Sequence, residues 1–299
     1  YDIRQRCTRH VGPDGVTNIY SRDAAGRINV IQIPGQGAIA CEYNYANRIT
    51  RLAFPGGVAE EVNYDALSRE ISETLKDPAG NTLLMREYSR NRIGWVTQIA
   101  TDRGQFTYAY DGLGQLISEV DTVQGNRDFI YDGDGNRGGD GSTTNVWVYN
   151  ELNQLVQAGA SSYEYDANGN LVREAVGGAV VREYEYDIQN QLIAVRDGAE
   201  TVLARYEYDP LGRRIKKEAA GQVTWYAYAD EGLAAEFDGQ GQVIRSYGHY
   251  PAAEWGSLPL YLATEGRFCF FANDRLGTPL ALVESSGGIA WSPAYEAFG

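Results

Sequence analysis

The chain has 299 residues, with 26 Lys and Arg against 40 Asp and Glu, which gives a net charge of -14. This acidic balance argues against a nucleic-acid-binding protein, because neutralising phosphates needs a basic surface. No run of about 18 apolar residues occurs, so we expect no membrane span. The 43% hydrophobic content is too high for a disordered chain.

A Tyr-Asp motif repeats along most of the chain. A worn copy comes first, with Tyr20, Asp23 and Gly26. The regular copies place an aromatic residue at Tyr43, Tyr64, Tyr110, Tyr131, Tyr149, Tyr165, Tyr186 and Tyr208. Asp follows at Asp65, Asp111, Asp132, Asp166, Asp187 and Asp209, and Gly three residues later at Gly114, Gly135, Gly169 and Gly212. We take Tyr88-Ser89 as a degenerate copy in the widest gap, so the period is about 21 residues.

Each copy has the chemistry of a β-hairpin. Residues 163–165 alternate aromatic and charged side chains, as a half-buried strand does. Asp166 can accept hydrogen bonds from N–H groups two or three residues on, and Gly169 tolerates the positive φ that lets the chain return. One hairpin alone is barely stable, so we predict an all-β fold in which tandem hairpins of about 21 residues form one curled or spiral sheet.

The C-terminal part is less regular. Residues 231–237 fit one turn of helix or a strand equally well, and Trp255 lies in a Pro-rich link that it is expected to anchor. We predict a repeat array over residues 1–245 and a capping segment over 246–299, within one continuous domain.

Three stretches resemble the YD repeats and associated core of Rhs proteins, of the C component of insecticidal toxin complexes and of teneurins. They are residues 208–214 (YDPLGRR), 273–279 (NDRLGTP) and 291–299 (WSPAYEAFG). The resemblance implies a β-strand spiral that closes into a hollow shell around a C-terminal toxin domain. In that family a self-cleavage motif ending in a DPxGL-type sequence normally follows; the chain stops before it, so neither self-cleavage residues nor a toxic activity is carried over. The sequence is compatible with a closed shell and with an open arc.

The sequence gives only weak indications of metal binding or catalysis. Asp132, Asp134, Asn136 and Asp140 resemble the start of a Ca²⁺ loop, but the template fails at Arg137 and Thr143. His10 and His249 are the two candidate catalytic bases, and neither lies in a catalytic motif. We expect no enzyme activity and no cofactor. Cys7, Cys41 and Cys269 fit small buried hydrophobic residues, and a Cys7–Cys41 bridge stays open.

The function expected from this sequence is a non-enzymatic shell or scaffold of a secreted Rhs-type toxin. Its expected partners are a C-terminal effector domain or its equivalent, a secretion-system component or a glycan, with no nucleic acid and no membrane span. The alternative is a cell-surface adhesion module that binds glycan or protein through exposed Tyr and Asp. A hydrolase is the third alternative. The chain has 40 Asp and Glu, so the sequence does not single out any pair of them as catalytic carboxylates.

Overall fold

The computed structural model describes residues 1–139, 146–251, 253, 255–256, 258–274, 276–293 and 295. Within these ranges the chain forms 29 β-strands, one short 3-10 turn (η1, Pro55–Gly57) and no α-helix. The prediction of an all-β fold is therefore confirmed. The described residues contain no helix that is long and apolar enough to cross a bilayer.

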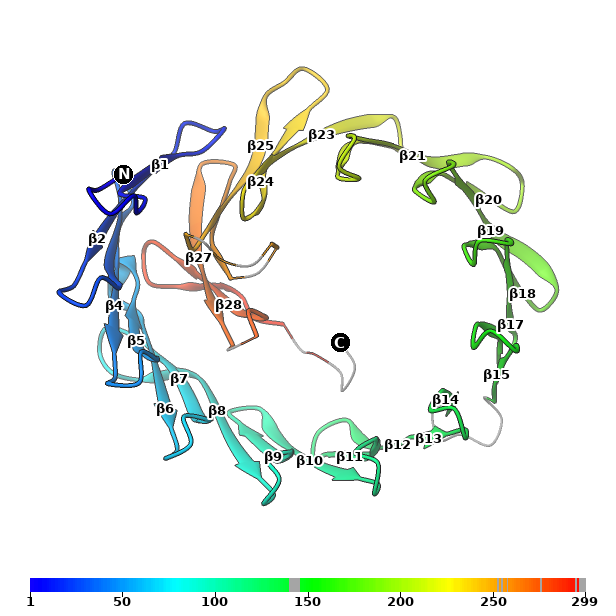
Figure 1. Ribbon diagram of the computed structural model, residues 1–299, viewed down its shortest axis with the longest axis horizontal. Helices are drawn as coiled ribbons and strands as arrows, with labels where there is room; N and C mark the ends of the chain where they lie inside the picture. The colour runs from blue at the N-terminus through cyan, green and yellow to red at the C-terminus, as the bar shows by residue number, and fades with distance from the viewer. Residues whose placement is uncertain are drawn as a thin grey trace. The chain divides into compact units, whose positions relative to one another are not determined.

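Figure 1 labels most of the strands. They belong to two compact units. Unit 1 comprises residues 1–105, 227–237 and 242–299, and unit 2 comprises residues 106–226 and 238–241. The strands of unit 1 are β1 (Arg9–Val11), β2 (Thr17–Arg22), β3 (Ile28–Ile33), β4 (Gly37–Tyr43), β5 (Ile49–Ala53), β6 (Ala59–Tyr64), β7 (Glu70–Lys76), β8 (Thr82–Arg90), β9 (Val96–Thr101), β24 (Gly232–Asp238), β25 (Val243–His249), β26 (Pro259–Thr264), β27 (Arg267–Asn273), β28 (Pro279–Glu284) and β29 (Ile289–Trp291).

Unit 2 contains shorter hairpins, and its first and last strands, β10 and β23, run across its limits. Its strands are β10 (Gly104–Tyr110), β11 (Leu116–Asp121), β12 (Gly125–Asp128), β13 (Ile130–Tyr131), β14 (Arg137–Gly139), β15 (Trp147–Tyr149), β16 (Leu155–Ala158), β17 (Ser161–Tyr165), β18 (Leu171–Val176), β19 (Ala179–Tyr186), β20 (Leu192–Asp197), β21 (Val202–Tyr208), β22 (Arg214–Ala219) and β23 (Gln222–Ala229).

Consecutive strands pair antiparallel in both units, as tandem hairpins require. In unit 1 this order runs from β1 to β9 and from β24 to β29. In unit 2 it forms three stretches, β10–β12, β13–β14 and β15–β23. Each Tyr that ends a strand pairs with the residue six positions later across a bulge, as in Tyr64 with Glu70 and Tyr165 with Leu171. The bulge comes from the extra turn residue that the hairpin must accommodate.

The main hydrophobic core lies inside unit 1, where β26–β28 pack on the sheet that contains β2–β7. Ile31, Ile39 and Leu75 from that sheet and Phe270 and Val283 from the C-terminal strands are at most 1% exposed and share one cluster. Figure 1 shows β27 and β28 alongside β4 within this unit. Burying each such side chain contributes about 1.5–3 kcal/mol, so this layer is the most strongly held part of unit 1.

Unit 2 has far fewer buried apolar side chains. Those that are buried in its described part are Phe129, Ala194 and Ala204. Its strands follow the sequence alternation, since along β17 the tyrosines are half-buried and Ser162 and Glu164 are exposed. The unit is therefore held mainly by its backbone ladder and by contacts between its turns.

Two further sequence predictions can be placed on the strands. Residues 232–238 form β24, so the strand reading of that segment is right and the helical one is wrong. Position 245 lies in the middle of β25, and residues 246–291 continue the same hairpin pattern. A boundary between a repeat array and a capping segment at residue 245 stays a prediction.

Candidate functional site

The repeated turn is the feature that recurs with fixed geometry. In the turn that begins at Asp166, Oδ1 accepts the N–H groups of Asn168 and Asn170, each at 2.9 Å. The Asp166 N–H donates to the Asn170 carbonyl, and the Gly169 N–H donates to the Asp166 carbonyl. Gly169 has φ +89°, where glycine carries no steric penalty. The N–H groups bound by the carboxylate thus lie two and four residues on, where the sequence had suggested two or three.

The same pair of backbone hydrogen bonds and a positive φ at the fourth residue occur in turns that begin at Gly12, Phe54 and Glu284. Among the described residues, fourteen further turns share this geometry and begin at Asp or Asn. They begin at Asp2, Asp23, Asn44, Asp65, Asp77, Asn91, Asp111, Asp132, Asn150, Asp166, Asp187, Asp197, Asp209 and Asp274. Sequence reasoning missed several of them because it searched for a Tyr in front of the Asp. Asp77 and Asp197, for example, follow Lys76 and Arg196.

The copy proposed at Tyr88-Ser89 is wrong. Both residues lie within β8, and the turn begins two residues later at Asn91, with Arg90 in the position that Tyr holds elsewhere. The worn copy predicted at Tyr20, Asp23 and Gly26 does form the turn, which begins at Asp23 and has Gly26 at positive φ, but Tyr20 does not hold the position in front of it. Tyr20 lies inside β2, and Arg22 directly precedes the turn at Asp23.

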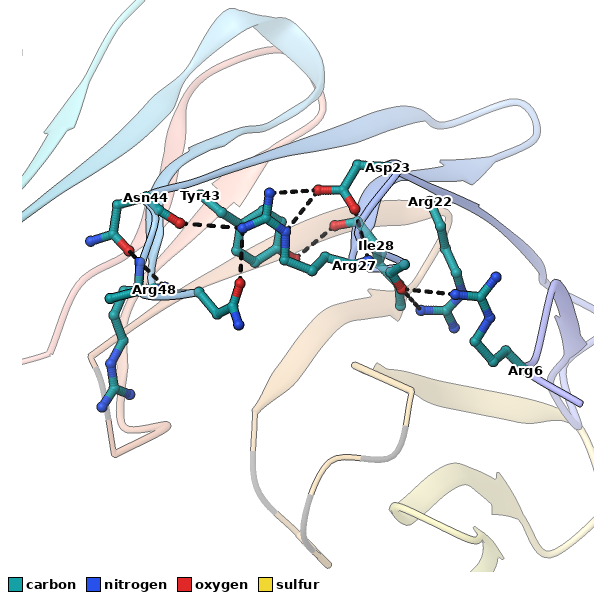
Figure 2. Close-up of polar contacts among 11 residues, drawn as sticks. Arg6, Arg22, Asp23, Arg27, Ile28, Tyr43, Asn44 and Arg48 are labelled. Atoms are coloured by element: carbon teal, nitrogen blue, oxygen red, sulfur yellow. Dashed lines mark hydrogen bonds and ion pairs between the residues drawn. The ribbon is translucent and has the colours of Figure 1, made fainter. Parts of the chain in front are cut away.

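The Tyr hydroxyl connects one turn to the preceding one. Tyr43 donates to the Ile28 carbonyl at 2.7 Å (Figure 2), and Tyr64 donates to the Ile49 carbonyl at 2.7 Å. Unit 2 has the same bond from Tyr131 to Leu116, at 2.8 Å. The same kind of hydroxyl bond is made by Tyr165 and Tyr208. The strand-ending position is also occupied by Tyr110, Tyr149 and Tyr186.

These bonds explain why a Tyr suits the position. In all three of the bonds measured above, the accepting carbonyl lies five residues after the Asp or Asn of the preceding turn. Burial raises the pKa of Tyr43 and of Tyr64 to about 12, so both hydroxyls stay neutral and keep the proton that they donate. The ring fills the space between adjacent hairpins while its hydroxyl remains hydrogen-bonded.

The residue four positions after the Asp forms a second link between turns. Arg27 Nε donates to Asp23 Oδ2 at 2.7 Å, and its Nη1 reaches the Asn44 carbonyl and Asn47 Oδ1 at 3.2 and 3.0 Å (Figure 2). In unit 2 this link is an amide ladder. Asn170 Nδ2 donates both to Asp166 Oδ2 and to Asn190 Oδ1.

This second link was not recognised in the sequence, although its signal was present. The position is Arg, Asn or Gln in eleven of the fourteen turns, namely Arg6, Arg27, Arg48, Arg69, Asn81, Gln115, Asn136, Gln154, Asn170, Gln191 and Arg213. All three residue types carry N–H donors on a side chain that is long enough to reach the next turn.

Hydrogen bonds hold the turn carboxylates of Asp65 and Asp166 in their ionised form. Backbone and side-chain hydrogen bonds from Arg69 lower the pKa of Asp65, and the Asn170 amide lowers the pKa of Asp166. Both effects follow from donating hydrogen bonds to a charged carboxylate. These acids are therefore engaged in turn structure.

The calcium candidate gains no support from this geometry. Asp132 Oδ1 accepts the N–H groups of Asp134 and Asn136, and Oδ2 accepts the Asn136 amide at 3.0 Å. Asp140 lies outside the described residues. Across the described ranges, no three His, Cys, Asp or Glu side chains come together in a way that could hold a metal ion.

The remaining reactive side chains have structural surroundings. His249 Nε2 lies 3.0 Å from the Leu233 carbonyl, which occupies one ring nitrogen. The three cysteines are free thiols, so the Cys7–Cys41 bridge that the sequence left open is absent from the structure. Trp255 stacks on Tyr228 with the ring centroids 5.7 Å apart, which is the anchoring expected of it.

Unit 1 also has an open groove of about 810 Å³ between β1–β2 and the β26–β27 hairpin. Its lining includes Arg9, Arg267 and Phe268, and Asp14 is the one acid among its described lining residues. A hydrolytic site needs a nucleophile or activated water together with a base. Among the described residues that line it, this groove offers a single carboxylate and neither His nor Cys.

A sheet of tandem hairpins whose turns are tied to one another by Tyr hydroxyls and by Arg, Asn or Gln side chains defines a YD-repeat shell protein. The profile of the Teneurin YD-shell family matches residues 61–299, and the chain belongs to this family.

The relatives are much longer proteins, several of which are named as toxins or nucleases. The chain is 27% identical over 276 residues to double-stranded DNA deaminase toxin A of Burkholderia cenocepacia, covering 82% of the chain and 19% of that protein. It is 25% identical over 297 residues to the probable deoxyribonuclease RhsA of Dickeya dadantii, covering 92% of the chain and 20% of that protein. The chain thus spans about a fifth of the length of each.

The same fold occurs in solved toxin-complex structures. The Tc holotoxin pore of Photorhabdus luminescens contains a chain that matches all of this one with a TM-score of 0.70, at 17% identity and over 17% of that chain. The crystal structure of TcdB2-TccC3 matches the full chain with a TM-score of 0.70, at 18% identity and over 18% of that chain. At this level of identity the likeness is one of fold.

Proposed function

We propose that the chain is a wall segment of a toxin-associated β-shell, which encloses or presents a C-terminal effector that is not contained in these residues. The role is steric. A continuous sheet separates the effector from solvent and from proteases, and the chain itself performs no catalysis. Because several relatives are named as toxins, we also propose that the protein acts outside the cell that makes it, in secreted or surface-bound form.

The observation that carries this proposal is the link from each turn to the next. An ordinary array of hairpins is joined by its backbone ladder alone, and single hairpins open readily. Here Tyr43 and Tyr64 each tie their own hairpin to the one before it, and Arg27 ties two successive turns. Such a wall resists local opening, which a container needs.

Protease protection tests the proposal. An effector-type polypeptide without stable structure would be fused after Gly299, and its digestion would be compared with that of the same polypeptide added separately. We expect the fused polypeptide to survive at least about tenfold longer, since a protected segment is cleaved only through rare opening. Equal digestion rates would contradict enclosure, and specific binding of the chain to a glycan array would then favour the adhesion alternative.

A further inference from the structure

Two glutamates from neighbouring strands are buried together in unit 1. Glu60 on β6 and Glu73 on β7 are each 2% exposed. The register pairs Glu60 with Leu75 and Val62 with Glu73, so the two acids are diagonal neighbours on one face of the sheet. Two carboxyl groups buried next to each other on one face repel when both are charged, so this arrangement favours a proton on at least one of them.

The surroundings supply little to compensate two negative charges. Glu60 Oε2 and Glu73 Oε2 are both buried and accept no hydrogen bond from the described residues. Arg86, opposite Glu73 on β8, is the cation that acts on the pair. The other titratable groups facing it are Tyr64 on β6, Glu70 on β7, Tyr88 on β8, Tyr250 after β25 and Asp274 after β27. Glu70 and Asp274 add negative charge.

The pair lies where the two layers of unit 1 meet. Leu75, opposite Glu60, belongs to the core cluster that includes Leu260, Phe270 and Val283 from β26–β28. The groups that act on the pair from the other layer are Tyr250 and Asp274, at the ends of β25 and β27. A change of charge on the pair therefore acts directly on the contact between the layers.

We propose that the Glu60–Glu73 pair is a proton-dependent latch between the two layers of unit 1. With a shared proton, the carboxyl groups bond to each other and β26–β28 stay packed on β6–β8. When the last proton leaves, two carboxylates and the nearby Asp274 repel one another in a site that excludes water, and the C-terminal strands loosen.

The direction of the pH effect follows from linkage. Burial, and for Glu73 also its contacts with Glu60, raises the pKa of both groups, and the pKa of Glu60 reaches about 7 against an ordinary 4.5. In that window the folded state holds more protons than the unfolded state, so stability falls as pH rises. The contribution is fully present below about pH 4.5, falls as pH rises through about 7, and is lost as pH rises through the pKa of Glu73 at about 10.

Hydrogen exchange on the intact chain tests the latch. Amide exchange in β27 and β28, corrected for the intrinsic pH dependence, would be measured from about pH 5 to about pH 10, which reaches the pKa of Glu73. The proteins compared are the wild type, Glu60→Gln, Glu73→Gln and the exposed control Glu87→Gln on β8. In the wild type we expect opening of β27 and β28 to increase at least about tenfold across this range, which one unit of pKa shift produces.

The two glutamine variants mimic the protonated pair, so each should flatten this rise, and Glu87→Gln should leave it unchanged. An unaltered rise in both Glu60→Gln and Glu73→Gln would overturn the proposal. It would also be overturned if protection fell equally in β2–β4 and β27–β28, because that pattern means global destabilisation and no latch. Two independent variants keep the test decisive if one of them folds poorly.

Discussion

The Tyr hydroxyl is one of the two groups that join a repeat to its neighbour, and its removal tests that link directly. Tyr64→Phe keeps the ring but leaves the Ile49 carbonyl without its donor. We expect a loss of about 1 kcal/mol in the free energy of unfolding, measured by urea denaturation. Tyr45→Phe is the control, because Tyr45 is 96% exposed at a turn tip and should change stability very little. Equal effects of the two substitutions would contradict a linking role for the hydroxyl.

The turn at Asn44 offers a substitution that should stabilise the protein. In the turn at Asp65, Arg69 forms an ion pair with the turn carboxylate, with Nε–Oδ2 at 2.7 Å. Arg48 occupies the corresponding place after Asn44 but faces an uncharged amide. Asn44→Asp should therefore create the missing pair and add about 0.2–1 kcal/mol, the range for exposed pairs. The gain should vanish in the Asn44→Asp/Arg48→Gln double variant and shrink in about 1 M salt; a gain that persists in both would point to another cause.

At the scale of elements, the period of the hairpins could be predicted from sequence because turn chemistry is local. The Asp side chain bonds its own backbone within four residues, so a Tyr-Asp pair marks a turn wherever it occurs. The repeat was misplaced at Tyr88 because the turn is formed by Asn91 and does not need a Tyr in front of it. Arg90 occupies that position. The burial of Glu60 and Glu73 could not be predicted, since nothing local to β6 and β7 indicates that the sheet is covered by β26–β28, which lie about 200 residues further along the chain.

Two turns pack backbone to backbone in unit 1, and this contact can be tested. A Cβ on Gly56 would lie 2.5 Å from the Gly287 nitrogen and 2.7 Å from the Ser285 carbonyl oxygen, and Gly56 has φ +79°. Gly56→Ala should therefore cost both left-handed strain and a backbone displacement. Gly80 has φ +86°, and a methyl group added there would meet nothing within 4 Å, so this position isolates the strain alone.

We expect Gly80→Ala to lower the free energy of unfolding by about 1–2 kcal/mol, the cost of a non-glycine residue in this region. Gly56→Ala should cost at least about 1 kcal/mol more, because overpacking adds to the strain. Thermal and urea unfolding of the two variants gives the difference. If the variants are equally stable, the contact between the two turns contributes nothing.

For the whole molecule, two sets of acids act in opposite directions on stability. The turn aspartates Asp65 and Asp166 have lowered pKa values, so their contribution is present above about 3.8 and is lost as pH falls below it. The Glu60–Glu73 pair has raised pKa values, so its contribution is lost as pH rises above 4.5. The net charge of -14 adds repulsion at neutral pH. The melting temperature should therefore be highest between about pH 4 and pH 5.

Added salt distinguishes the two causes of the fall in melting temperature above pH 5, which are the buried Glu60–Glu73 pair and the repulsion between exposed charges. Added NaCl screens repulsion between exposed charges, whose Debye length is about 10 Å at 0.1 M, but it acts weakly on a buried pair. At pH 8 we expect salt to restore part of the melting temperature of the wild type, and Glu73→Gln to restore the remainder. Melting curves by circular dichroism at pH 3 to 9, with and without 0.5 M NaCl, measure both parts. A stability maximum at pH 7 or above in the wild type would show that the buried pair does not control the pH dependence of this shell segment.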